Sequence, residues 1–218
     1  MTWVLKRDRD VSWSSRLRSS ISMALFGGVA SLAIAESPNP SQVHIQSLSY
    51  AGSGCPAGTV SENLSADAKA FTLLFDTYIA EAGPGIRLSE GRKNCQINVD
   101  LRVPGGWSYS IIDVDYRGYA NIERGGTGTQ KTYYYFQGQA TGPSLSTLIQ
   151  GPFDNDYQVR DSLGLAAMVW SPCGASRSLN LNTQVRVSAA RGRSAMMTLD
   201  SVDGQLTHIY RLAWRRCQ

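Results

Sequence analysis

Acidic side chains that could catalyse hydrolysis or bind a cation occur at two places in the chain. The first is Asp113 and Asp115, which are two residues apart in a segment with strand character, so both side chains leave the same face. Two neighbouring carboxylates can perform acid–base chemistry or bind calcium. An ordinary solvated strand face is the alternative interpretation.

The second acidic group comprises Asp154, Asp156 and Asp161, which follow a Gly-Pro dipeptide. A loop here would offer several oxygens to calcium, but the spacing lacks the ordered ligands and terminal glutamate of an EF-hand. Turn formation by Asp and Asn explains the group equally well. We therefore expect no cofactor, and calcium is the one that this acidic group leaves open.

Tyrosines form a second kind of candidate site. Tyr133, Tyr134 and Tyr135 are consecutive, so an extended segment must present aromatic rings on both of its faces. One face can fill the core, and exposed rings on the other could stack on sugars or on a partner protein. Tyr116 and Tyr119 could extend this platform. Coverage of both faces within the fold is the alternative.

Signatures of common enzyme classes are absent from the sequence. It contains no G-x-S-x-G nucleophile elbow, no H-E-x-x-H and no P-loop. A Ser-His-Asp site would need His44 or His208. His208 lies on the apolar face of a predicted strand, which indicates a core histidine, and His44 lies near the expected mature N-terminus.

Four cysteines indicate disulfide bonds, because an even number of cysteines in an exported chain usually pairs. Sequence alone allows three pairings. We favour Cys55–Cys95 and Cys173–Cys217, since each would tie an irregular loop to the start or end of a strand. A zinc site is disfavoured, because no two cysteines have C-x-x-C spacing and the two histidines are far apart.

Residues 1–35 have the three parts of a secretory signal peptide: a basic start, an apolar run and a small-residue cleavage site at Ala33-Ile34-Ala35. Cleavage after Ala35 would leave Glu36 as the mature N-terminus, with residues 36–45 flexible. An uncleaved anchor is the alternative. No later segment is long and apolar enough to span a membrane, so we expect a secreted, extracellular protein.

Removal of the signal peptide changes the charge of the protein. The full chain is formally +4, but residues 1–35 carry five basic and two acidic side chains, so the remainder is near +1. Basic and acidic residues are interspersed in that remainder. The sequence therefore gives no support for a nucleic-acid partner.

Alternating apolar and polar residues predict β-strands throughout the mature chain. The apolar positions from Ile97 to Val103 alternate with polar ones until Pro104-Gly105-Gly106. In the segment that starts at Trp107 the apolar parity changes, which predicts a bulge near Ile111. Many strands with Gly/Pro turns and no alternation with helices predict an all-β fold, a single antiparallel β-sandwich over residues 46–218 with two disulfides.

With these residues in hand, the chain resembles DUF4360, a family of secreted proteins of unknown function. The resemblance covers about residues 43–218 and rests on motifs that occur in the expected order: Gly52-Ser-Gly-Cys-Pro56, Phe75-Asp76, Ala82-Gly-Pro-Gly85, Lys93-Asn-Cys-Gln96, Val103-Pro-Gly-Gly106, Tyr116-Arg-Gly-Tyr-Ala120, Trp170-Ser-Pro-Cys-Gly174 and Trp214-Arg-Arg-Cys217. It implies a secreted, disulfide-containing β domain and transfers no catalytic residues.

The sequence thus favours a non-catalytic binding or structural module at the cell exterior, with a glycan or another cell-surface component as partner. The alternative function is an extracellular hydrolase that uses the acidic pair or the acidic loop. Asn63 lies in an Asn-Leu-Ser sequon for glycosylation. Oligomeric state is left open.

Overall fold

The computed structural model describes residues 36–139, 142–164, 168–173, 178–199 and 208–217. The expected signal peptide and its cleavage site lie outside these residues. The described chain consists of strands and two 3-10 helices, η1 (Pro40–Gln42) and η2 (Leu88–Gly91). Regular structure starts before the expected domain boundary at residue 46, because η1, the buried Val43 and the first strand from His44 precede it.

Five antiparallel strands form one sheet, which we call sheet A. Their order across the sheet is β1 (His44–Ala51), β5 (Arg92–Arg102), β10 (Leu179–Ser188), β7 (Thr127–Phe136) and β8 (Ser144–Gln150). On β5 the apolar odd positions Ile97, Val99 and Leu101 are buried, and their polar neighbours are not. The predicted half-buried strand is therefore confirmed.

Seven strands form the second sheet, sheet B. The order is β2 (Val60–Leu64), β3 (Ala70–Phe75), β12 (His208–Arg216), β6 (Trp107–Ile122), β11 (Ala195–Thr198) and β4 (Ile79–Ala82), while β9 (Phe153–Ser162) pairs with β6. β6 is long enough to pair with β12 along its first part and β11 at its end. β9 pairs along the other side of β6.

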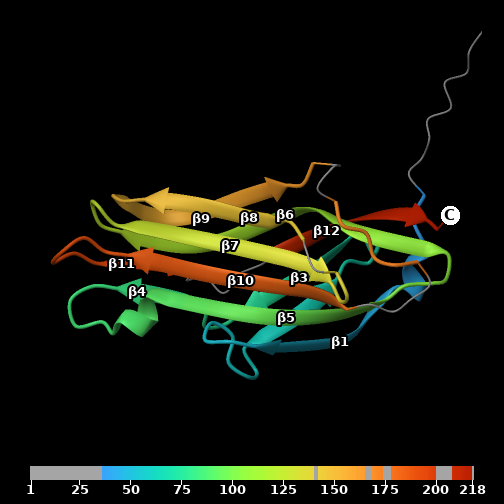
Figure 1. The fold of residues 1–218 in the computed structure, drawn as a ribbon, viewed down its shortest axis with the longest axis horizontal. Coiled ribbons are helices and arrows are strands. Elements are labelled where there is room, and N and C mark those ends of the chain that lie inside the picture. Colours follow the sequence, from blue (N-terminus) through green and yellow to red (C-terminus); the bar gives the residue numbers. More distant parts are fainter. Residues whose placement is uncertain (1–35, 140–141, 165–167, 174–177, 200–207, 218) are drawn as a thin grey trace, which may run out of the picture. The chain divides into compact units, whose positions relative to one another are not determined.

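The two sheets pack face to face, with sheet A in front of β3, β12 and β6 in Figure 1. Rings from both layers fill the space between them: the ring centres of Tyr109 of sheet B and Phe136 of sheet A are 5.1 Å apart. The hydroxyls of Tyr78 and Thr183 form a buried hydrogen bond of 2.9 Å. The protein is therefore an antiparallel β-sandwich, as predicted.

A register shift on β6 changes which side chains point into the core. β12 pairs Arg211 with Asp113 and Leu212 with Ile111, which leaves Ile112 as the extra residue of a bulge. Before the bulge Tyr109 and Ile111 face inward, and after it Val114 and Tyr116 do. The predicted bulge is confirmed, and it turns Asp113 and Asp115 away from the core.

Both disulfides have the favoured pairing. Cys55, in the connection between β1 and β2, is bonded to Cys95 on β5, with Cα atoms 5.5 Å apart. Cys173 is bonded to Cys217, directly after β12, with Cα atoms 5.7 Å apart. Each bond joins an irregular segment to a strand or its end, and no described cysteine is free.

Candidate functional site

The outer face of sheet A carries two facing rows of amide side chains. Because the odd positions of both β5 and β10 point into the core, the even positions point outward. The register then pairs Asn98 with Asn180, Gln96 with Asn182 and Asn94 with Gln184. We call these six residues the amide strip.

Hydrogen bonds within the protein occupy only part of the hydrogen-bonding capacity of the amide strip. Asn98 Nδ2 donates to Asn180 Oδ1 at 3.0 Å, and Ser53 Oγ donates to Asn94 Oδ1 at 3.1 Å. Gln96 is exposed. Each amide carries two N–H donors and an oxygen with two lone pairs, more than these bonds occupy. The strip can therefore exchange several hydrogen bonds with hydroxyl groups of a ligand.

Two tyrosines flank the strip on β7. Tyr135 lies opposite Asn180 and Tyr133 opposite Asn182. Their ring centres are 5.4 Å apart with an angle of 38° between the planes, and both side chains are half-buried. Gly142 N–H donates to the Tyr133 hydroxyl at 3.1 Å, which fixes that ring. The pair presents an ordered aromatic surface beside the amides.

A shallow groove of about 330 Å³ crosses one end of this face. Tyr135, Asn98 and Asn180 line it together with Asn182, Gln96 and residues of β1. The groove therefore combines an aromatic ring with amide donors and acceptors, a combination that suits a polar ligand with some apolar surface.

Two of the five candidate tyrosines lie elsewhere, in the core. Tyr134 and Tyr116 have no exposed surface, and burial raises the pKa of both hydroxyls. Neither side chain can therefore contact a ligand as part of the predicted tyrosine platform. Strand alternation is the reason for Tyr134, since its neighbours Tyr133 and Tyr135 point outward.

Tyr119 lies on the outer face of sheet B, away from the amide strip. It is half-buried on β6, on the face opposite to the core residue Tyr116. Its hydroxyl donates to a carboxylate oxygen of Asp154 on β9, and this hydrogen bond raises the pKa of Tyr119. Tyr119 therefore belongs to a different surface from Tyr133 and Tyr135.

Asp113 and Asp115 are buried and paired with arginines, so the solvated face considered above is wrong. Arg211 of β12 contacts both carboxylates, with Nη2 2.6 Å from Asp115 Oδ2. Arg160 of β9 lies 2.9 Å from Asp113 Oδ2. Hydrogen bonds to the two carboxylates raise the pKa of Arg211. Carboxylates neutralised in this way are poorly suited to act as a general base or to bind calcium.

The second acidic group is on a strand rather than in a loop. On β9, Asp154 and Asp156 point outward, whereas Asp161 has the opposite parity and points inward, where burial raises its pKa. The three carboxylates therefore do not converge on one point. Across the described ranges no three His, Cys, Asp or Glu side chains gather where they could hold a metal ion.

His208 is a core residue, as its position on the apolar face indicated. It is fully buried, and its ring packs edge-on against Tyr116 with centres 4.9 Å apart. Burial lowers the pKa of its imidazole to about 3. His44 lies exposed at the start of β1, so neither histidine is placed beside a nucleophile and an acid.

Sequence reasoning missed the amide strip as a site. A signal was present, because the even positions of 94–98 and of 180–184 are all Asn or Gln. The two segments are 82 residues apart at the Asn98–Asn180 pair. Nothing in either segment alone shows that they are neighbours in one sheet.

Comparison with known proteins places the chain in a family. The family model described as "Domain of unknown function (DUF4360)" matches residues 41–217. An uncharacterized secreted protein of Arthroderma benhamiae is 49% identical over 181 residues, which cover 83% of this chain and 74% of that protein. With its two disulfides, this chain is a secreted protein as well. No helix in the described part of the chain is long and apolar enough to cross a bilayer.

Two solved structures show weak similarity. The enzymatically active domain of bacteriophage CBA120 tailspike protein 4 aligns with a TM-score of 0.26 and 16% identity over 82% of this chain, which spans only 20% of that structure. TmCBM61 in complex with β-1,4-galactotriose aligns with a TM-score of 0.24 and 8% identity over 79% of this chain and 90% of that one. At such low TM-scores, neither protein's ligand or activity informs the function of this chain. The family match covers most of the chain, and the chain belongs to the DUF4360 family.

Proposed function

We propose that this secreted protein is a non-catalytic glycan-binding module whose binding surface is the amide strip together with Tyr133 and Tyr135. The observation that carries the proposal is the register that places three facing amide pairs beside two outward tyrosines. Sugars present hydroxyl groups that amides can bind and C–H faces that pack on aromatic rings. A sheet face with both features fits a linear glycan lying along the strands.

The spacing of the amide pairs also indicates how such a glycan would be bound. Successive outward residues on an antiparallel strand are about 6.8 Å apart, because each residue advances the strand by about 3.4 Å. The three amide pairs are therefore repeated at an even spacing along the strip. An extended polysaccharide chain lying along the strip would therefore contact one pair of amide side chains at each interval.

The alternative function, an extracellular hydrolase, has less support. Its two candidate groups were the Asp113/Asp115 pair and the acidic group on β9. The first is neutralised by Arg211 and Arg160. Carboxylates of the second point to opposite sides of a strand.

The test is a binding screen of the protein against glycans and cell-wall polysaccharides, followed by titration of the ligand found. Tyr135→Ser should weaken binding about ten-fold, because it removes an aromatic stacking surface worth roughly 1.4 kcal/mol. The free energy of unfolding should change by only about 1 kcal/mol, because the ring is half-buried.

Tyr119→Ser is the matched control. It removes a tyrosine of similar exposure from the outer face of the other sheet, and binding should stay at the wild-type level. Equal affinity of wild type and Tyr135→Ser for the ligand would refute the proposed surface.

A further inference from the structure

The amide strip ends in a facing pair of arginines. Arg92 and Arg186 come next in the register after Asn94 and Gln184, and both are exposed on the same face of sheet A. Like charges directly opposite each other on neighbouring strands are destabilising. The pair therefore costs stability unless an anion lies between or above the two guanidinium groups.

No carboxylate of the described residues forms an ion pair with Arg92 or Arg186. Two acidic groups near this end are paired with other cations: Glu90 with Arg87 at 2.8 Å and with Lys93 at 2.6 Å, and Glu123 with Arg193 at 3.2 Å. Lys131, opposite Gln184 on β7, adds a further exposed cation one row away. At this end of the strip Arg92 and Arg186 are therefore exposed cations that no described carboxylate pairs with.

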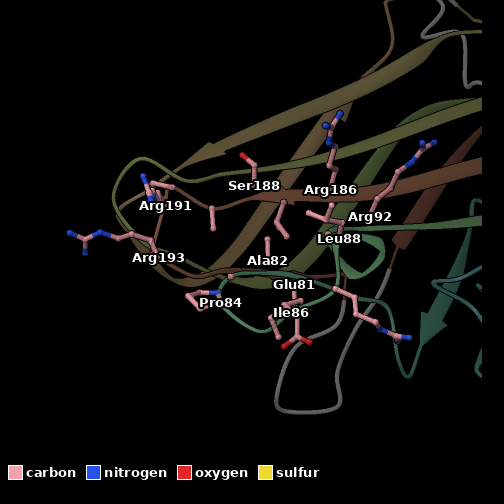
Figure 2. A pocket seen from close by; sticks show the side chains of 17 residues that line it. Glu81, Ala82, Pro84, Ile86, Leu88, Arg92, Arg186, Ser188, Arg191 and Arg193 are labelled. Carbon is pink, nitrogen blue, oxygen red and sulfur yellow. The ribbon is translucent and has the colours of Figure 1, made fainter.

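The arginines line a depression of about 950 Å³ (Figure 2). In Figure 2 the Arg92 and Arg186 side chains extend from β5 and β10 in the same direction, and Arg191 lies in the neighbouring turn. The carboxylate that lines the depression, Glu81, is on its other side from Arg186. A bound group thus meets two guanidinium groups directly beyond the last amide pair.

We infer that the ligand is an acidic glycan, with the carboxylate of a uronic acid residue bound by Arg92 and Arg186 while the adjoining sugars lie on the amide strip. This inference rests on the proposed function. The guanidinium group is a planar fork of N–H donors that matches a carboxylate in two parallel hydrogen bonds. A polysaccharide that carries its carboxylates on the sugar rings brings the charge to the arginine row and hydroxyl groups to the amide rows.

The test compares two polymers that share one sugar chain: polygalacturonate and its methyl ester, in which the carboxylates are neutral. Wild-type protein should bind the acid about ten-fold more tightly than the ester. The double variant Arg92→Gln/Arg186→Gln should bind the acid only as tightly as the ester, with ester binding unchanged. Added salt should weaken only the binding of the acid.

Arg102→Gln/Arg117→Gln is the control for net charge. Arg102 is an exposed residue of β5 at the other end of the same strand, and Arg117 is exposed on sheet B. These two changes should leave the ten-fold preference intact. An equal loss of acid binding in both double variants would mean unspecific attraction of a polyanion and would overturn the inference.

The outcomes separate this inference from the proposed function. If wild type binds acid and ester equally, or binds only a neutral glycan, while Tyr135→Ser abolishes that binding, the glycan surface stands and the acidic ligand is wrong. If binding is indifferent to Tyr135→Ser, the proposed surface itself is wrong. Folding is not at risk in the arginine variants, because they remove exposed like charges; their melting temperatures should equal or exceed that of the wild type.

Discussion

His208 is an ionisable side chain in the middle of the core. Its ring lies between Tyr116 and Phe75, with ring centres 4.9 and 5.0 Å away, and it has no exposed surface. Within the described residues its Nε2 has no hydrogen-bond partner. The Tyr210 hydroxyl lies 3.4 Å from its Nδ1, but no described carboxylate forms an ion pair with the ring, so a protonated imidazole would be a buried charge, and burial holds the pKa at about 3.

This low pKa predicts that the protein loses stability in mild acid. An unfolded histidine has a pKa of about 6.5, so below that pH the unfolded chain binds a proton that the folded chain does not. The free energy of unfolding should fall by about 1.4 kcal/mol per pH unit from roughly pH 6 toward pH 4. Above pH 7 the group is neutral in both states and has no effect. Urea unfolding at pH 7, 6 and 5 measures the slope.

The contribution of His208 is isolated by His208→Phe, which keeps a ring in the core and removes the titration. Carboxylates that titrate in the same range are common to both proteins, so the difference between the two slopes belongs to His208. Parallel pH profiles for wild type and His208→Phe would show that His208 is not held neutral.

At the scale of strands, the sequence predicts single elements better than their neighbours. The alternation from Ile97 onward shows which residues of that strand point inward. It cannot show that β10 lies beside it, because pairing depends on contacts across the whole sheet. The amide strip arises only when the outward positions of two such strands are placed side by side.

The acidic pair shows the same limitation. The spacing of Asp113 and Asp115 correctly puts both on one face of β6. Their partners come from β9 and β12, and Arg211 is 98 residues from Asp113. Distant arginines turn a candidate reactive pair into a structural ion-pair cluster, and no local pattern reveals them.

Trp214 tests the packing of the last strand, β12. Its parity with Tyr210 and Leu212 predicts a buried side chain on the inner face. The structure has it only partly buried, packed at the edge of the core with its ring centre 5.7 Å from that of Tyr109. Its Nε1 donates to the carbonyl of Ala68 at 3.1 Å. Trp214→Ala should cost about 3 kcal/mol of unfolding free energy, the lower end of the range for large aromatic truncations.

Trp214→Phe separates the two contributions in the same denaturation experiment. It keeps an aromatic ring against Tyr109 and loses the bond to Ala68, so it should cost about 1 kcal/mol. Identical losses in the two variants would mean that ring packing contributes little and would contradict the inner-face register of β12.

For the whole molecule, composition and period were sufficient to predict the architecture. The sequence has segments of period two, turn residues between them and little helical periodicity. Sheets that are apolar on one face must bury that face, and without helices they can do so only by packing against each other. The strand order within each sheet could not be predicted from the sequence, because it depends on contacts between distant segments. An example is the pairing of β9 and β11 with opposite sides of β6. The cysteine pairing was predicted because only some pairings tie loops to strand ends.

The disulfides should dominate the stability of the whole molecule. The bonded cysteines are 40 and 44 residues apart, so each bond removes about 4 kcal/mol of chain entropy from the unfolded state. Small domains are stable by about 5–15 kcal/mol in total. Full reduction should therefore shift the urea midpoint strongly or unfold the protein at 37 °C, measured by circular dichroism with and without reductant. The denatured, unreduced protein should contain no titratable thiol.

Cysteine-to-alanine variants measure the contribution of each disulfide to the free energy of unfolding. Cys55→Ala/Cys95→Ala and Cys173→Ala/Cys217→Ala should each lower the free energy of unfolding by up to about 4 kcal/mol, and the two losses should approximately add, because the bonds close loops that do not overlap in sequence. An unchanged urea midpoint in protein whose four thiols all titrate after reduction would contradict this account. If the losses are as large as expected, the chain reaches its full stability only in an oxidising compartment, so export and folding are coupled for this protein.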